Sequence, residues 1–190
     1  MMSIKDIIKK RSMSLYKLSL VSEIPYSTLY DIFNEKTDLK SCSAETVYKL
    51  SHALGMTVDM LLSPVMIKRS DFELYKSNVC HKLKELGDRK FILETIRDNE
   101  IRMCYIWGWY PECFYLLAML DYICRINNIP MFDEYDDIRQ YKLEETIYPA
   151  GLRVFAVATK DESVLDEAYK TAIPEFVRFN IVENEVRNVV

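Results

Sequence analysis

Residues 14–34 read SLYKLSLVSEIPYSTLYDIFN, and this stretch decides the fold of the first part of the chain. Apolar residues recur in it at helical spacing, in two sets with a break between them. The sets are Leu15, Leu18 and Val21, and then Ile24, Leu29 and Ile32. Only Ser22 and Glu23 lie in the break, which leaves room for nothing but a tight corner. The pattern therefore predicts two short helices that cross at a corner, a helix-turn-helix.

The second of these helices carries hydrogen-bonding side chains on the face opposite its apolar residues. They are Tyr26, Ser27, Tyr30 and Asp31. A helix-turn-helix protein places such residues at base edges in the major groove, so we expect these four to contact bases. Pro25 suits the first position of this helix, where its missing N–H costs nothing. The alternative is an ordinary corner between two helices of an all-α protein.

Four segments around the corner match a known pattern at the expected spacing. They are Ser14, Leu18 and Ser19; Ser27-Thr28-Leu29 with Ile32; residues 44–50 with Ala53-Leu54-Gly55; and residues 57–62. On these segments, residues 3–64 resemble the Cro and phage-repressor (XRE-type) helix-turn-helix family. The resemblance implies a five-helix domain that binds a double-stranded DNA operator. It also aligns Tyr26, Ser27 and Tyr30 with base-contacting positions of that family.

The chain departs from the family pattern at two places. The family often has glycine at the corner, where this chain has Glu23. It often has Glu then Gly just after the third helix, where this chain has Phe33 and Glu35. The first departure leaves open whether the corner adopts the left-handed backbone that glycine favours. The second leaves open where the third helix ends.

The charges of the chain are unevenly divided between its two parts. Residues 1–70 hold ten Lys and Arg against seven Asp and Glu, a net charge of +3, whereas residues 71–190 hold 15 against 22, a net charge of −7. A surface that faces DNA phosphates is therefore expected in the first part. Lys17, Lys36 and Lys40 flank the proposed recognition helix, and we expect them to contact phosphates. The basic residues 9–11 suit a phosphate contact and a helix carboxyl end equally well.

The composition favours an all-α protein of two domains. The 190 residues are 49% hydrophobic and 28% charged, with only four glycines and six prolines to interrupt helices. We expect a helix-turn-helix domain over residues 1–66, a linker after Pro64, and a helical domain over residues 71–190. In the first domain, Ser3, Ser43 and Thr57 are expected to cap the first, fourth and fifth helices, and the fifth helix is expected to end near residues 63–64.

The second domain is expected to consist of helices alone. The expected helices cover residues 72–86, 88–96, 101–106, 112–126, 133–141, 151–159 and 162–172. Pro174 opens a last helix that includes Phe176, Val177, Phe179, Ile181 and Val182. Residues 112–126 are the most apolar and should form the centre of the core. In residues 133–141, Tyr135, Ile138 and Tyr141 are expected to point inward. Residues 151–159 fit a helix or a strand, and a helix is favoured because an isolated strand has no partner.

No catalytic, metal or cofactor site is predicted, and we expect a protein that is not an enzyme. The chain has two histidines and lacks a glycine-rich phosphate loop, an H-E-x-x-H motif and a G-x-S-x-G motif. Its five cysteines form no C-x-x-C pair and are expected to be reduced and mostly buried. Acidic residues gather at Asp133, Glu134, Asp136 and Asp137. The start of a helix explains this cluster more simply than a metal ion does.

These features favour a cytoplasmic transcriptional regulator, a dimeric repressor that recognises the major groove with its third helix. The longest apolar run, residues 113–120, is too short to span a membrane. The dimer interface is expected in residues 71–190, because residues 1–70 have few apolar residues beyond those their own core needs. The candidate surfaces are residues 112–126, the aromatic turn of Trp107, Trp109 and Tyr110, and residues 173–190. The tryptophans also fit a second description, as anchors of the core.

A second function stays open at this point. Residues 71–190 faintly resemble the helical domains fused to such DNA-binding modules in bacterial regulators, some of which belong to toxin–antitoxin pairs. The resemblance lies in residues 115–118, 127–130 and 173–180. It implies an antitoxin-like protein that neutralises a toxin-like partner through residues 71–190 and represses its own operon.

Overall fold

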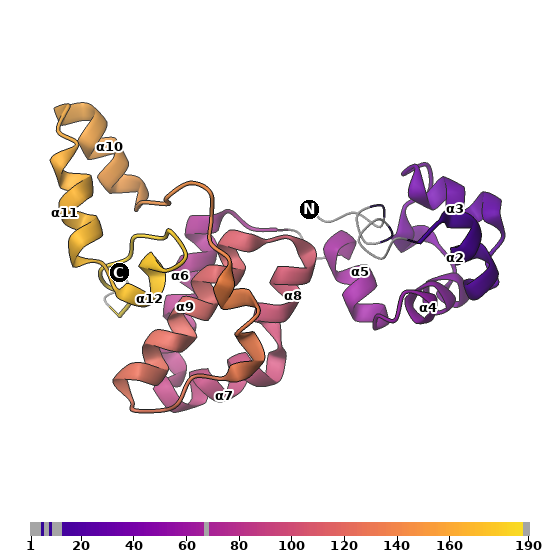
Figure 1. The fold of residues 1–190 in the computed structure, drawn as a ribbon, viewed down its shortest axis with the longest axis horizontal. Coiled ribbons are helices and arrows are strands. Elements are labelled where there is room, and N and C mark those ends of the chain that lie inside the picture. The colour runs from indigo at the N-terminus through magenta and orange to yellow at the C-terminus, as the bar shows by residue number, and fades with distance from the viewer. Residues whose placement is uncertain (1–4, 6–7, 9–12, 67–68, 188–190) are drawn as a thin grey trace. The chain divides into compact units, whose positions relative to one another are not determined.

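The computed structural model describes residues 5, 8, 13–66 and 69–187 (Figure 1). Contacts between Cα atoms divide the chain into two compact units, residues 1–69 and residues 70–190. The described residues form helices and no strands, which confirms the expected all-α class. An isolated parallel bridge joins Ile147 and Ile181 in the second unit.

The first unit is built from four described helices and a short 3-10 turn. They are α2 (Leu15–Ser22), α3 (Tyr26–Phe33), η1 (Leu39–Ser41), α4 (Ala44–Ala53) and α5 (Val58–Met66). Their apolar faces meet in one core that includes Leu18, Leu29 and Leu50, each at most 2% exposed. Ile8 joins this core, whereas the other residues assigned to the first helix and its basic end, including Ser3 and residues 9–11, lie outside the described residues.

Side-chain caps start three of these helices, and the sequence predicts two of them, at Ser43 and Thr57. The hydroxyl of Ser14 accepts a hydrogen bond from Lys17 N at 3.1 Å, and that of Ser43 accepts one from Thr46 N at 3.2 Å. Thr57 Oγ1 accepts one from Met60 N at 3.1 Å. Each bond satisfies one of the amide groups that a helix leaves free at its amino end.

Two expectations for the first unit are wrong. Val21 is 56% exposed, and Ser22 is buried in its place at the end of α2. Ser22 fits there because its hydroxyl donates to Leu18 O at 2.7 Å and accepts from Ile24 N at 3.3 Å. The fifth helix also continues past Pro64 to Met66 rather than ending there. Pro64 lies near the end of this helix, where the loss of one backbone hydrogen bond leaves the preceding turns intact.

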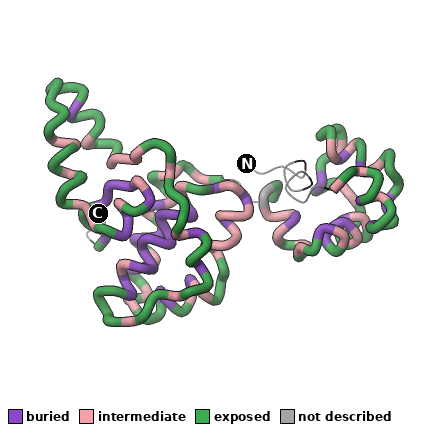
Figure 2. Tube along the Cα trace, viewed as in Figure 1, coloured by how far each residue is buried: buried purple, intermediate pink, exposed green. Residues whose placement is uncertain are grey.

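The second unit surrounds one buried helix, α9. Its elements are α6 (Phe72–Leu86), α7 (Asp88–Asp98), α8 (Glu100–Trp107), α9 (Tyr110–Ile126), η2 (Asp133–Tyr135), η3 (Ile138–Gln140), α10 (Ala150–Thr159), α11 (Ser163–Thr171) and α12 (Pro174–Val177). Every residue from Glu112 to Asp121 is buried, and α6, α7, α8 and α12 all contact α9. Figure 2 shows the buried residues concentrated there, whereas α10 and α11 are exposed along most of their length.

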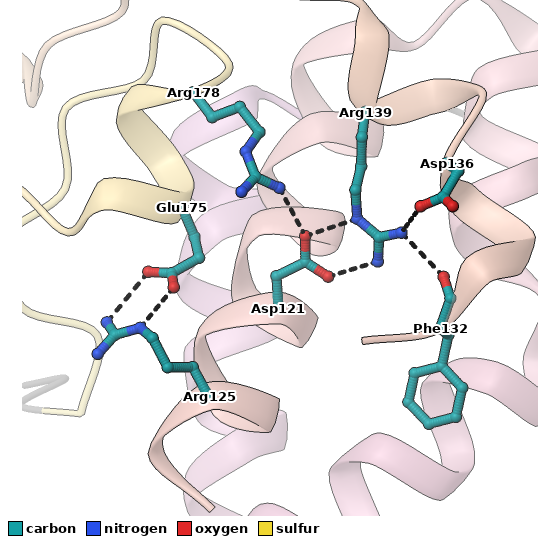
Figure 3. Close-up of polar contacts among 7 residues, drawn as sticks. All are labelled: Asp121, Arg125, Phe132, Asp136, Arg139, Glu175 and Arg178. Carbon is teal, nitrogen blue, oxygen red and sulfur yellow. Dashed lines mark hydrogen bonds and ion pairs between the residues drawn. The ribbon is translucent and has the colours of Figure 1, made fainter. Parts of the chain in front are cut away.

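Ion pairs fasten later segments of the chain to α9 (Figure 3). The carboxylate of Asp121 pairs with Arg139 at 2.7 Å and with Arg178 at 3.4 Å. Arg125 donates two hydrogen bonds to Glu175, at 2.5 and 3.1 Å. Because Asp121 is only 1% exposed, these partners offset the cost of burying its charge.

Residues 133–141 form two 3-10 turns instead of the expected helix. Arg139 explains the difference, because its guanidinium donates to Phe132 O at 2.9 Å and to Asp136 at 2.7 Å while it pairs with Asp121. These bonds draw the segment around the arginine and away from a regular helix. Tyr135 and Ile138 are buried as expected, but Tyr141 is 55% exposed.

The last helix is shorter than the sequence predicts. α12 makes a single turn, and the chain then reaches Asn180, which has a φ of +60°. From there the backbone bonds to an earlier segment: Ile147 N donates to Asn180 O at 2.9 Å, and Val182 N donates to Ile147 O at 2.8 Å. These bonds replace a further helical turn while Phe176, Phe179 and Ile181 remain fully buried.

Residues 151–159 are helical, as favoured, but their apolar residues face solvent. Val154, Phe155 and Val157 are 69%, 53% and 79% exposed, and Ala156 is the buried residue of α10. α10 packs against α11, none of whose residues is buried. The two helices form a helical hairpin that projects from the rest of the second unit (Figure 1).

Candidate nucleic-acid interface

The corner between α2 and α3 is fixed by short-range hydrogen bonds. Glu23 adopts the left-handed backbone with φ of +55°, the conformation for which the family favours glycine. Ser19 Oγ donates to Ile24 O at 2.7 Å across the corner. Pro25 precedes α3 as its N-cap, one position earlier than expected. The departure at Glu23 therefore leaves the corner intact, because Glu23 itself adopts the left-handed backbone and Ile24 beside it is buried.

The recognition face of α3 is the surface formed by Tyr26, Ser27, Tyr30 and Asp31. Leu29 and Ile32, on the opposite side, are 2% and 6% exposed. Tyr26 and Tyr30 are 49% and 44% exposed, and their rings stack with centroids 6.2 Å apart. Ser27 is also exposed, and Asp31 is half-buried. The structure thus brings all four predicted residues to one face.

Lys36 lies beside this recognition face. Its Nζ is 3.9 Å from the carboxylate of Asp31 and 5.4 Å from the centroid of the Tyr30 ring. The loop is held there because Lys36 N and Thr37 N both donate to Asp31 O, at 2.9 and 3.2 Å. The ammonium group offsets the carboxylate, which would otherwise repel a phosphate backbone.

The other two predicted phosphate contacts differ in their surroundings. Lys40 lies in η1 and pairs with Asp38 at 3.1 Å, with both side chains about half exposed. Lys17 is exposed on α2, and its ammonium group has no ion-pair partner within the described ranges. An exposed ion pair is weak, so separating Lys40 from Asp38 costs little. The three lysines are thus all exposed, positively charged side chains of the first unit.

The third helix ends at Phe33, a point that the sequence left open. Asn34 follows it, and its side-chain amide donates to Tyr30 O at 2.8 Å. Glu35, two residues after the end of the helix, then adopts φ of +59°, in the left-handed region that glycine favours. Glu23 and Glu35, at the two departures from the family pattern, thus both adopt this left-handed backbone.

Sequence reasoning missed an apolar set on the outer side of α2. Tyr16 and Leu20 are 67% and 64% exposed, and their four-residue spacing places them on one helix face. That spacing was the signal that could have identified them. The expectation that residues 1–70 have few spare apolar residues is therefore wrong.

The tryptophans and cysteines of the second unit are buried, and among the residues that the structure describes they form no reactive site. Trp107 and Trp109 are each 6% exposed and pack together at 4.8 Å between ring centroids, so they are anchors of the core. Burial raises the pKa of Cys113 to about 12 and that of Cys124 to about 11, which keeps these thiols protonated. All five cysteines are free.

Two of the four residues in the acidic cluster after α9 are paired with arginines. Asp136 pairs with Arg139, and Asp137 pairs with Arg102 at 2.5 Å. Within the described residues, no group of three or more His, Cys, Asp or Glu side chains has a geometry that could hold a metal ion. None of the described helices combines the length and the hydropathy that crossing a membrane requires.

Comparison with known proteins gives one match. Residues 3–65 match the family model of the Cro/C1-type HTH DNA-binding domain, which confirms the resemblance stated above. No curated protein and no solved structure matches the chain. The match covers α2 to α5 and ends before the second unit begins.

Proposed function

We propose that this chain, whose residues 3–65 are a Cro/C1-type helix-turn-helix DNA-binding domain, is a dimeric repressor that acts in the cytoplasm. The observation that carries the proposal is the recognition face of α3. Four hydrogen-bonding side chains lie there on a helix whose other side is buried in the core of the first unit. α3 inserts into the major groove of an operator, and Lys17, Lys36 and Lys40 contact the flanking phosphates.

The chemistry of the recognition face suits base contacts. Hydroxyl groups of Tyr26, Ser27 and Tyr30 can both donate to and accept from base edges. The tyrosine rings can also lie against a thymine methyl group, which the major groove exposes. When the ammonium group of Lys36 leaves Asp31 and contacts a phosphate instead, the carboxylate of Asp31 can accept a hydrogen bond from a cytosine amino group. The face therefore offers distinct contacts to several bases of one half-site.

Two copies bind one operator in this proposal, and α10 supplies the surface on which they meet. Repressors of this type bind half-sites about 34 Å apart, so something must hold two copies together. Most of residues 112–126, which were first considered for this, are buried in the core, as are Trp107 and Trp109. Val154, Phe155 and Val157 remain exposed on a ten-residue helix. Isolated helices of this length are marginally stable in water, and packing against a second copy would stabilise the hairpin.

The second candidate function uses the same surface differently. If a toxin-like protein covers α10, the chain is an antitoxin that also represses its own operon. The exposed apolar residues of α10 favour this candidate as well, since they suit any apolar partner. A toxin-like gene beside the gene for this chain, and a complex of the two proteins at equal stoichiometry, would distinguish it from a repressor without a partner.

Selection of genomic DNA fragments by the full-length chain, followed by sequencing, tests the proposal. We expect the enriched fragments to share a palindromic site whose half-sites lie about one helical turn apart. A variant with Ser27→Ala and Tyr30→Ala should lose this enrichment while it keeps its fold. Enrichment of no common site by the unaltered chain would overturn the proposal.

A further inference from the structure

The second unit contains a pocket of about 540 Å³ beside the amino end of α9. Side chains from α8, from α9 and from the segment before α10 line it. They include Tyr105, Tyr110, Phe114, Tyr141, Glu144 and Glu145. The volume falls within the range of about 300–1,000 Å³ that small-molecule sites occupy. Nothing in the DNA-binding proposal uses this pocket.

Aromatic rings form the wall of the pocket. The centroid of the Tyr105 ring lies 5.7 Å from that of Tyr110 and 5.9 Å from that of Tyr141. The Tyr110 ring stacks 6.0 Å from Phe114, which is only 2% exposed and stacks in turn on Phe179 at 5.0 Å. Phe114 and Phe179 thus form a fixed base, on which the more exposed tyrosines present their rings.

The charge of the lining is negative. Glu144 and Glu145 are both exposed, and no ion pair holds either carboxylate within the part of the chain that the structure describes. Lys142 is the cation among the lining residues, so the pocket carries a net charge of −1. Burial, together with a hydrogen bond that the Tyr105 hydroxyl donates to Tyr141, raises the pKa of Tyr105 to about 12. The phenol therefore stays neutral at physiological pH.

We propose that this pocket binds a small organic cation that carries a quaternary ammonium group. The face of an aromatic ring attracts a cation within about 6 Å of its centroid, and several rings around one site add their attraction. The two carboxylates attract the same charge at longer range. A quaternary ammonium group is preferred over a primary one because it is weakly hydrated and makes no hydrogen bonds that the rings would leave unsatisfied.

Other ligand classes fit the lining less well. An anion would be repelled by two carboxylates and attracted by a single lysine. A neutral apolar molecule would use the rings but leave the carboxylates without a role. A lysine side chain of a partner protein shares the ammonium chemistry, and the experiment below separates it from a small molecule.

Calorimetric titration of the full-length chain tests the assignment with choline and with 3,3-dimethylbutan-1-ol, the neutral molecule of the same shape. We expect saturable binding of one choline per chain, about tenfold tighter than binding of the alcohol. N-acetyl-lysine N-methylamide, which carries a primary ammonium group, should bind more weakly than choline. Equal binding of choline and the alcohol, no saturable binding of choline, or tighter binding of the lysine analogue would each overturn the proposal.

Variants locate the site. Tyr141→Leu, and separately the double change Glu144→Gln with Glu145→Gln, should each weaken choline binding about fivefold or more. Lys142→Gln should strengthen it, which a change that merely disturbs folding would not do. Tyr48→Leu, an exposed tyrosine 58% accessible on α4, is the matched control and should leave choline binding unchanged. Choline binding that persists in the Tyr141 and glutamate variants would also overturn the assignment.

Discussion

Arg139 and Asp121 form a bidentate ion pair in which Nη2 and Nε of the arginine lie 2.7 and 2.9 Å from the two carboxylate oxygens. Both side chains are buried, at 8% and 1% exposed. The pair joins the centre of α9 to η3, and Arg178 adds a third contact from the segment after α12. One carboxylate thus holds three segments of the second unit together (Figure 3).

Asp121→Asn should destabilise the second unit by roughly 3–5 kcal/mol, because it leaves the buried guanidinium of Arg139 without its main counter-charge. Chemical denaturation monitored by fluorescence of the buried tryptophans measures this. Asp136→Asn is the matched control, since Asp136 pairs with the same arginine but is 65% exposed. Its cost should stay below about 1 kcal/mol. Equal costs for both variants would show that burial of the pair contributes little.

Glu175 should make the second unit sensitive to acid. Burial alone would raise the pKa of this carboxyl group, but hydrogen bonds from Arg125 and from the backbone lower it below its ordinary value of 4.5. The folded form therefore holds its proton less tightly than the unfolded form. The stabilisation is present above the ordinary pKa and is lost as the pH falls through the lower folded-state value.

Thermal unfolding between pH 3 and pH 7 tests this. Glu175→Gln should lower the melting temperature near pH 7 and flatten its decline on acidification. Glu85→Gln is the control, because that exposed carboxylate has no ion pair among the residues that the structure describes. An unchanged acid profile in Glu175→Gln would assign the sensitivity to other groups.

Ser27→Ala and Tyr30→Ala should each weaken binding to the selected operator by about 1–3 kcal/mol and relax the preference at individual base pairs. The loss follows from hydrogen bonds that alanine cannot make to base edges. Binding to a panel of single-base operator variants measures it. Tyr48→Ala serves as control, since it removes an exposed tyrosine from α4 rather than from the recognition face. If specificity and affinity hold in both α3 variants, the assignment of this face is wrong.

Lys17→Ala, Lys36→Ala and Lys40→Ala should each reduce the salt dependence of operator binding by about one unit of slope in log affinity against log salt. Each phosphate contact releases about one counterion from the DNA, so a variant that lacks the contact releases one fewer. Lys82→Ala, a lysine of the second unit paired with Asp98, should leave the slope unchanged. A slope that no first-unit variant alters would mean that these lysines are solvated surface only.

Val154→Glu with Val157→Glu should convert the proposed dimer into a monomer and remove most of its operator affinity, because two charges would enter the proposed apolar interface on α10. Sedimentation and DNA titration measure the two effects. Leu93→Glu is the matched control and should leave both properties unchanged, because it places a charge on α7 at an apolar residue that is 68% exposed. Dimers that survive in the α10 variant would move the interface elsewhere, with Tyr16 and Leu20 on α2 as the next surface to change.

The sequence by itself determined a large part of the local structure of this protein. The caps at Ser14, Ser43 and Thr57, the corner at Glu23 and the outward face of α3 follow from residues within a few positions of one another. The central place of α9 follows as well, because a helix that is apolar on nearly every side can only be stable when other elements surround it. Periodicity and capping are short-range properties, so the sequence displays them directly.

Only the tertiary structure decided which faces are covered. Val154 and Val157 match a buried helix face in pattern, yet they lie exposed because no segment of the second unit that the structure describes covers their side of α10. The rings of Tyr105 and Tyr141 pack together although the two residues are 36 positions apart in the sequence. Asp121 and Arg178 likewise form an ion pair between distant segments. Such pairings depend on where the chain returns after its turns. Burial is therefore a property of the packed unit, and no local pattern of residues contains it.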